Sequence, residues 1–174
     1  MGISLKWVTR SFPHVDRTSS AWLIKRFIDP QAEFVFINWP EEDIPTDATP
    51  FDIKGVELGH HNNKCTFETI IKKYNIKDSA VLKIAELVHA ADIEEDLDKV
   101  PEARGVRAII SGPRLAAKDD YEALELGFKI WDTLYAYYTY LELIDKYQDE
   151  LTSMDRTQRL QFLREKIREY IAFV

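Results

Sequence analysis

Cysteine is scarce in this sequence, and no long apolar run is present. One cysteine among 174 residues cannot form an internal disulfide, so stability must come from packing, and such usage is typical of a reducing compartment. No stretch is apolar enough to span a bilayer, and the N-terminal residues lack the basic segment and apolar run of a signal peptide. We therefore expect a soluble cytoplasmic protein with no membrane partner.

Basic charge is also in short supply. The chain carries 23 Lys and Arg against 30 Asp and Glu, which gives a formal net charge of -7. Non-specific binding to nucleic acid needs a basic face that displaces counterions from phosphates. The acidic balance opposes such binding, so we expect no direct nucleic-acid contact by this chain alone.

Hydrophobic residues make up 45% of the chain, which is enough for one compact domain with a substantial core. No internal repeat or low-complexity tract divides it, and we predict a single domain over residues 1–150. Residues 151–174 are predicted to form an amphipathic helix, because their apolar side chains fall on one stripe. This helix packs on the domain or on a partner subunit, and a homodimer is therefore expected.

The first third of the chain predicts a small, mainly parallel sheet. Strand-favouring residues occupy 5–9, helical spacing follows over 21–28, and 33–38 is apolar on both alternating faces, as in a buried parallel strand. A strand, helix, strand unit of this length is right-handed. A proline-rich connection over 39–50 then leads to a short third strand at 51–53.

The rest of the chain is predicted to be helical. Capping residues and helical spacing indicate helices over 66–73, 78–95, 102–110, 119–145 and 155–174. Asp78 and Asp119 cap two of them, and Gly112 with Pro113 ends the third. The predicted fold class is α+β: a small, mainly parallel N-terminal sheet (the βαβ unit plus a short third strand) packed on a larger helical C-terminal part.

Reactive side chains are concentrated between residues 51 and 68. Half of the four histidines lie there, and the other two, His14 and His89, each have an aspartate close by in sequence. The loops after the first and third strands leave the carboxyl ends of parallel strands, where ligands bind in open α/β sheets. The spacing of His89 and Asp92 places both on one helix face.

These residues form a candidate metal site. Imidazole and carboxylate together suit a divalent transition metal such as Zn, Mn or Fe. The candidate ligands are His60, His89, Asp92, Glu57, Asp52, His14 and Asp16. The alternative is structural: His89 as a hydrogen-bonded core histidine, Asp16 as a helix cap and Asp52 as a turn former. His61 is expected to face the surface.

Arginines near the same strand ends form a candidate anion site. Arg10 and Arg17 flank the His14 loop and are the better candidates for binding an oxyanion, with Arg114 as a further one. Arg26, inside a helix, is expected to pair with a carboxylate.

The single cysteine has two interpretations. Cys65 precedes a predicted helix start, which would lower its pKa and make a reactive thiol. A lone cysteine beside Phe67 also fits a small buried hydrophobe, which is the favoured interpretation.

The order of these motifs resembles the C-terminal domain of the chromate resistance protein ChrB family. The resemblance covers about residues 5–140. Its motifs are, in order, His14-Val-Asp-Arg17, Glu57-x-x-His60, Cys65-Thr-Phe-Glu68, Val88-His89-x-x-Asp92 and Trp131-Asp-x-Leu-Tyr135. It implies an association with chromate resistance, in a stand-alone sensor or accessory module that binds a metal ion or a chromate-like oxyanion.

Carried over residue by residue, the resemblance singles out a set of polar side chains. They are Asp16, Arg17, Glu57, His60, Cys65, His89 and Asp92. The region that precedes this domain in full-length ChrB has no counterpart here. Regulation of transcription by this chain alone is therefore not expected.

A looser likeness is to the DHH-type phosphoesterases. His14-x-Asp16, Asp52 and His60-His61 follow the order of their metal-binding motifs, although Gly59 replaces the aspartate before the histidines. The alternative function is therefore a metal-dependent hydrolase, in which the metal lowers the pKa of a water and Glu57 or Asp16 acts as base. A third interpretation is a partner-binding helical domain in which these polar residues serve packing.

Overall fold

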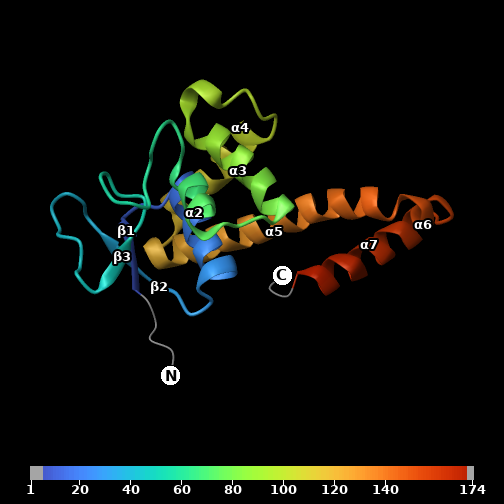
Figure 1. Ribbon diagram of the computed structural model, residues 1–174, viewed down its shortest axis with the longest axis horizontal. Coiled ribbons are helices and arrows are strands. Elements are labelled where there is room, and N and C mark those ends of the chain that lie inside the picture. Colours follow the sequence, from blue (N-terminus) through green and yellow to red (C-terminus); the bar gives the residue numbers. More distant parts are fainter. Residues whose placement is uncertain (1–5, 172–174) are drawn as a thin grey trace.

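A small sheet lies at one end of the molecule (Figure 1). The computed structural model describes residues 6–171. The strands are β1 (Lys6–Arg10), β2 (Glu33–Ile37) and β3 (Ala48–Pro50). β1 lies in the middle and pairs in parallel with both neighbours. Its residues Trp7, Val8 and Thr9 are buried, as a central strand requires, and the predicted α+β class is confirmed.

The helix between β1 and β2 begins earlier than the sequence indicated. It consists of α1 (Val15–Leu23) and a π-helical turn, η1 (Ile24–Ile28), so the predicted start at residue 21 is wrong. The polar residues before Ala21 suggested a loop, but the Thr18 hydroxyl donates to the carbonyl of His14 at 2.8 Å. Because such hydroxyls bond the backbone of their own helix, this polar stretch is helical and buried.

The third strand lies three residues before its predicted place. Phe51 still forms a parallel bridge with Leu58, but the chain leaves the extended conformation at Asp52, whose φ of 50° lies in the left-handed region. The Phe51 amide still donates to the Val8 carbonyl at 2.9 Å. The proline-rich connection that the sequence predicted over 39–50 therefore ends in β3.

The helical part follows after the loop that carries His60. Its elements are α2 (Thr66–Tyr74), α3 (Ser79–Asp92), the short 3-10 turn η2 (Glu94–Asp96), α4 (Ala103–Ala116) and α5 (Asp120–Lys146). The predicted caps of α3 and α5 are confirmed, because the Asp78 and Asp119 carboxylates accept the Val81 and Glu122 amides, each at 2.9 Å.

α4 continues past its predicted end. Gly112 and Pro113 lie inside the helix, which runs on to Ala116. A proline in a helix interior leaves the carbonyl four residues earlier, that of Ile109, without its helical donor. Ile109 is 58% exposed, so water can bond this carbonyl and the helix tolerates the proline.

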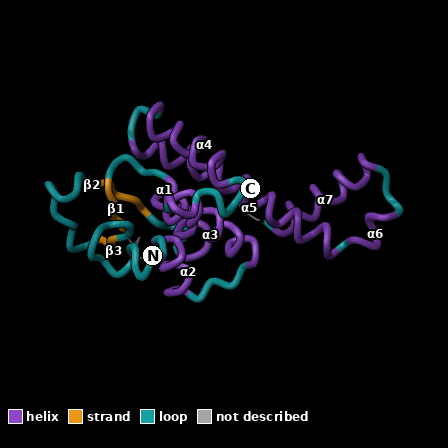
Figure 2. The backbone as a smooth tube through the Cα atoms, turned by 90° about the horizontal axis from the view of Figure 1, so that it is seen from above, coloured by secondary structure: helices purple, strands orange, loops and turns teal. Residues whose placement is uncertain are grey.

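The main core forms where α1 packs against α3 and α5 (Figure 2). Trp22 and Trp131 are fully buried, and their indole N–H groups donate to Asp132 at 2.7 Å and to the Thr18 hydroxyl at 3.0 Å. Arg26 also pairs with Asp132, at 2.7 Å, which confirms the carboxylate partner expected for it. Buried polar groups thus hold α1 and α5 in register.

α5 extends beyond this body, and the chain returns along it (Figure 1). The return consists of α6 (Gln148–Thr152) and α7 (Arg156–Tyr170). A second, small core of Leu143, Leu151 and Leu163 joins the three helices. α5, α6 and α7 therefore form a helical hairpin.

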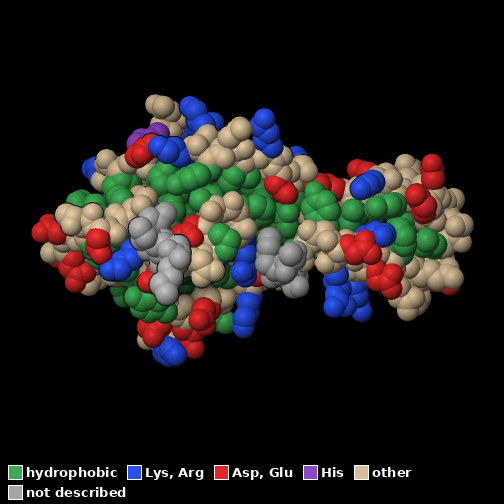
Figure 3. Space-filling model, turned by 60° about the horizontal axis from the view of Figure 1, so that its bottom comes forward, with side chains coloured by type: hydrophobic (Ala, Val, Ile, Leu, Met, Phe, Trp, Pro, Cys, Tyr) green, Lys and Arg blue, Asp and Glu red, His purple; other side chains and the backbone are tan. Residues whose placement is uncertain are grey.

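The apolar side chains that were predicted to form one stripe over residues 151–174 are only partly buried. Ile171 reaches the main core, whereas Leu160 stays 52% exposed and Val174 lies outside the described residues. Figure 3 shows hydrophobic side chains in a band that runs from the body into the hairpin, with charges of both signs beside it. No helix in the described part of the chain combines the length and the apolar composition that a membrane span needs.

Candidate functional site

A polar pocket of about 250 Å³ opens where β1 and β3 end. β1 leads into α1, whose first turn carries Asp16 and Arg17, and β3 leads directly to Asp52. The last turn of α3 brings Asp92 to the same place. The lining residues are Arg10, Phe12, His14, Asp16, Arg17, Asp52, His60, Asp92 and Arg114.

His60 is the centre of this pocket. Its Nε2 atom lies 2.9 Å from Asp16 Oδ2, 3.5 Å from Asp52 Oδ1 and 3.6 Å from Asp92 Oδ2. The hydrogen bonds to Asp16 and then Asp52 raise the pKa of His60 to about 10, so the ring is protonated at neutral pH. Three carboxylates therefore converge on one cation.

Asp16 joins the pocket to the helical layer. Its carboxylate accepts the amides of Thr66 and Phe67 at 2.7 and 2.9 Å, the first amides of α2. The structural interpretation of Asp16 as a helix cap thus fits, although the helix that it caps is α2 rather than its own. Each carboxylate oxygen also has a second partner, which is the Ser20 hydroxyl for Oδ1 at 3.3 Å and His60 for Oδ2.

Asp52 is buried among positive charges. Arg17 lies 2.9 Å from its Oδ2 atom, Arg10 donates to its carbonyl at 3.0 Å, and the Thr66 hydroxyl donates to its Oδ1 atom at 3.0 Å. Burial opposes ionisation, but the hydrogen bond from His60 and the charges of both arginines lower its pKa. Asp52 is therefore ionised.

Asp92 is a pocket carboxyl group whose pKa is raised. Burial and then the charge of Asp16 raise its pKa to about 6. Its closest cation is His60, whose proton is bonded to other carboxylates. Within the described residues, the nearest cation to Asp92 is thus His60 at 3.6 Å, so a cation bound beside Asp92 would stabilise its ionised form.

The opposite wall of the pocket is positive. Arg17 donates to the carbonyls of Ser11 and Phe12 at 3.0 and 3.2 Å and so fixes the turn after β1. His14 bonds the Ser111 hydroxyl at 2.9 Å, and burial and then the charge of Arg114 lower its pKa. His14 is therefore neutral at pH 7 and lies on the arginine side.

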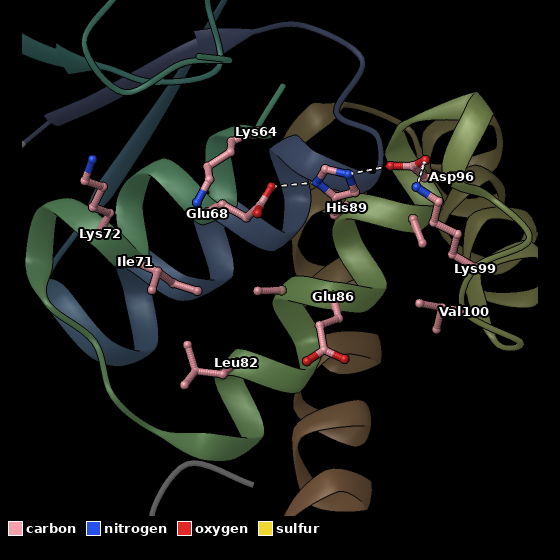
Figure 4. Close-up of a pocket in the computed structure, with 12 residues that line it drawn as sticks. Lys64, Glu68, Ile71, Lys72, Leu82, Glu86, His89, Asp96, Lys99 and Val100 are labelled. Atoms are coloured by element: carbon pink, nitrogen blue, oxygen red, sulfur yellow. Dashed lines mark hydrogen bonds and ion pairs between the residues drawn. The ribbon is translucent and has the colours of Figure 1, made fainter. Parts of the chain in front are cut away.

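His89 belongs to a second cluster (Figure 4). Its Nδ1 atom lies 2.7 Å from Glu68 and its Nε2 atom 2.8 Å from Asp96, so both ring nitrogens donate. Burial opposes the charge, but these hydrogen bonds raise the pKa of His89. The cluster borders a groove of about 620 Å³ whose floor includes Ile71 and Leu82.

The other candidates lie apart from the polar pocket. Glu57 is exposed and pairs with Lys73, and the His61 ring bonds the carbonyls of Val56 and Glu57 at the surface. Cys65 is fully buried at the start of α2, and burial raises its pKa. These surroundings oppose thiolate chemistry at Cys65 and agree with its interpretation as a small buried hydrophobe.

Comparison with known proteins identifies the family. The family described as ChrB, C-terminal domain, matches residues 7–138. The chain belongs to this family. Protein ChrB of Cupriavidus metallidurans is 32% identical over 139 residues, which cover 77% of this chain and 41% of that protein. The chain thus spans less than half the length of this curated relative, and no solved structure matches.

Membership of the ChrB C-terminal domain family confirms the resemblance that the sequence motifs indicated. The family region includes the whole polar pocket, from Arg10 to Arg114, and ends within α5.

Sequence reasoning missed several hydrogen-bond partners of the candidate metal ligands. Thr66 and Ser111 bond Asp52 and His14, and Asp96 bonds His89. A hydroxyl gives no site signal of its own in a sequence, and Asp96 follows the end of α3, where spacing along the helix no longer predicts direction. Glu68 had a signal, since it lies three residues after the Cys65 cap.

Proposed function

We propose that this chain is a metal-binding protein of chromate resistance, which holds a divalent transition metal between Asp16, Asp52, His60 and Asp92. The observation that carries the proposal is the convergence of three carboxylates on the His60 ring, within 2.9 to 3.6 Å of Nε2. Carboxylate oxygens with one imidazole suit Mn, Fe or Zn. A bound cation takes the place of the His60 proton and offsets the charge of Asp92.

An oxyanion such as chromate is the proposed second ligand. Arg10, Arg17 and Arg114 line the same pocket as the carboxylates. Arg10 and Arg17 face Asp52, whereas no hydrogen bond or ion pair holds the Arg114 side chain within residues 6–171. Arg114 therefore has its donors available for an anion, beside a metal ion that would attract the same anion.

Metal content of the purified protein tests this function. We expect wild type to retain added Mn, Fe or Zn through dialysis and to melt at a higher temperature with the metal, because a ligand that binds only the folded state stabilises it. His60→Ala and Asp92→Asn should lose both effects. The matched control is His61→Gln, since His61 lies next to His60 but bonds surface carbonyls. Equal metal retention by wild type and both site variants, or none by any, would refute the proposal.

A metal-dependent hydrolase is the second candidate. Its favouring observation is the raised pKa of Asp92, about 6, which gives a carboxylate that can accept a proton near neutral pH. The bases expected from the sequence fit less well, because Glu57 pairs with Lys73 outside the pocket and Asp16 caps α2. Turnover of phosphate esters by metal-loaded wild type would support this candidate over sensing. A cytoplasmic location and a homodimer stay predictions from the sequence.

A further inference from the structure

A second hollow of about 310 Å³ adjoins the polar pocket and shares its arginines. Its lining residues include Arg10 and Arg114 together with Phe12 and Trp39. An inorganic anion would contact the arginines alone and would leave Phe12 and Trp39 without a ligand contact. Its volume lies at the lower end of the range of about 300–1,000 Å³ for small-molecule pockets.

Phe12 is held in an unusual conformation with its ring in solvent. It has a φ of 56°, which is an outlier for a bulky side chain, and it is 61% exposed. Its amide donates to Asp120 Oδ1 at 3.0 Å, and its carbonyl accepts from Arg17 at 3.2 Å. Bonds on both sides maintain this strained turn, and its result is an aromatic face presented at the hollow.

Trp39 supplies a second aromatic wall. It is 37% exposed, whereas Trp7, Trp22 and Trp131 are at most 2% exposed. Planar rings stack on aromatic faces, and arginine contributes to such stacking. Phe12 and Trp39 therefore offer aromatic contacts to a planar ring that enters the hollow.

Charge at the hollow favours an anionic group beside that ring. Within residues 6–171 the Arg114 side chain has no hydrogen bond or ion pair, and the Arg10 side chain is 42% exposed despite its contacts with Asp52. Guanidinium groups bind phosphate through paired donors. Glu41, the one carboxylate that lines this hollow, can accept a hydrogen bond from a sugar hydroxyl.

We propose that the hollow bounded by Arg10, Arg114, Phe12 and Trp39 binds a phosphate monoester that carries a planar ring, of the nucleoside monophosphate class. The phosphate lies on the two arginines and the ring between the two aromatic side chains. The site uses the arginine side of the proposed oxyanion pocket but needs no metal ion. It binds a small molecule rather than a nucleic-acid strand, because the chain has a net charge of -7.

Titration of the metal-free protein with AMP and with UMP, followed by tryptophan fluorescence, tests the proposal. A ring that stacks in the hollow quenches Trp39, and the three buried tryptophans stay unaffected. We expect both nucleotides to bind at least about tenfold more tightly than the nucleoside, ribose 5-phosphate or inorganic phosphate, because each of these lacks one of the two contacts.

Variants assign the contacts. Arg114→Gln and Phe12→Ala should each weaken AMP binding at least about tenfold by calorimetry, and Trp39→Phe should remove the quenching but keep binding. Arg164→Gln, on the exposed face of α7, and Leu115→Ala, at a side chain that is 83% exposed on α4, are matched controls that should bind AMP as wild type does.

Two results would overturn the proposal: inorganic phosphate that binds as tightly as AMP, or a single-stranded oligonucleotide that binds more tightly than either nucleotide. The outcome is separate from that of the metal test. Because the titration uses metal-free protein, a failure to bind AMP leaves the metal site standing, and a failure to bind metal leaves an AMP result standing.

Discussion

At the scale of single residues, the charge on His60 decides what the polar pocket binds. The ring proton and a metal ion would satisfy the same oxygens of Asp16 and Asp52, so they compete. A pKa of about 10 means that metal binding at neutral pH must release this proton. Affinity for metal should therefore rise with pH across the neutral range.

Asp92 is predicted to cost stability when no metal is bound. Its pKa is about 6 in the folded protein, above the ordinary value of 3.8, so folding favours the protonated form. The free energy of unfolding of metal-free wild type should fall as pH rises from about 4 to about 6, because the folded state binds the extra proton in that window. Asp92→Asn should remove this loss and stabilise the protein by about 1–3 kcal/mol at pH 7.

Urea unfolding of wild type and Asp92→Asn in a chelating buffer measures this effect. Below about pH 4 the two proteins should be equally stable, since Asp92 is then protonated in both states. A variant that is less stable than wild type at pH 7 would contradict the raised pKa. Asp92→Glu, which keeps the charge, is the control and should not gain stability.

The sequence predicted where in the fold this pocket lies, but not which residues line it. The strand-end rule predicted that His14, Asp16, Glu57 and His60 meet, because parallel strands end at one edge. His14, Asp16 and His60 do line the pocket, whereas Glu57 pairs with Lys73 outside it. The sequence could not show that His89 and Asp92 belong to different clusters. Residues three apart on a helix differ by roughly 60° around the axis and 4.5 Å along it, and this was enough for one to meet Glu68 and the other His60.

At the scale of elements, the close approach of α1 and α5 depends on a glycine. A Cβ atom on Gly127 would lie 3.3 Å from Thr18, whereas one on Gly105 would have no neighbour within 4 Å. Thr18 cannot retreat easily, because its hydroxyl bonds the His14 carbonyl and accepts the Trp131 indole. Gly127→Ala should therefore destabilise the protein by about 1–2 kcal/mol, since overpacking outweighs the helix gain.

Gly105→Ala, at an exposed position of α4, is the matched substitution. It has a helix propensity gain without the contact, so it should stabilise the protein by about 0.5–1 kcal/mol. Thermal unfolding of both variants measures the difference. Equal shifts of the two melting temperatures would show that a Cβ atom at residue 127 does not clash with Thr18, and so that this contact does not limit how closely α1 and α5 pack.

Elements with a strong local signal were predicted well from the sequence, and elements fixed by distant contacts were not. α3 and α5 start at acidic caps that bond their own first turn, so the signal is local. α1 is a polar helix whose burial depends on α2 and α5, and β3 depends on pairing with β1. Neither partner can be read from the segment itself.

At the scale of the whole molecule, the family region ends at residue 138, within α5. The rest of the hairpin, which is the end of α5 together with α6 and α7, lies outside it. Its surface carries Leu160, 52% exposed, and Tyr170, 57% exposed. The expected homodimer would use such a face, but the same hairpin also closes back onto its own body. Ile171 is 2% exposed and belongs to the main core with residues of α1 and α3.

The return of the chain to the core predicts that the hairpin supports the pocket domain. Ile171→Ala should lower the free energy of unfolding by about 2–4 kcal/mol, because it removes buried methyl groups and leaves a cavity in the main core. Leu160→Ala, at an exposed position of α7, the helix that ends just before Ile171, should change it by less than about 0.5 kcal/mol. Urea unfolding at several protein concentrations separates this effect from dimerisation, since a dimer contact at Leu160 would make stability depend on concentration. Similar costs for both substitutions, without such dependence, would mean that the end of α7 does not belong to the core.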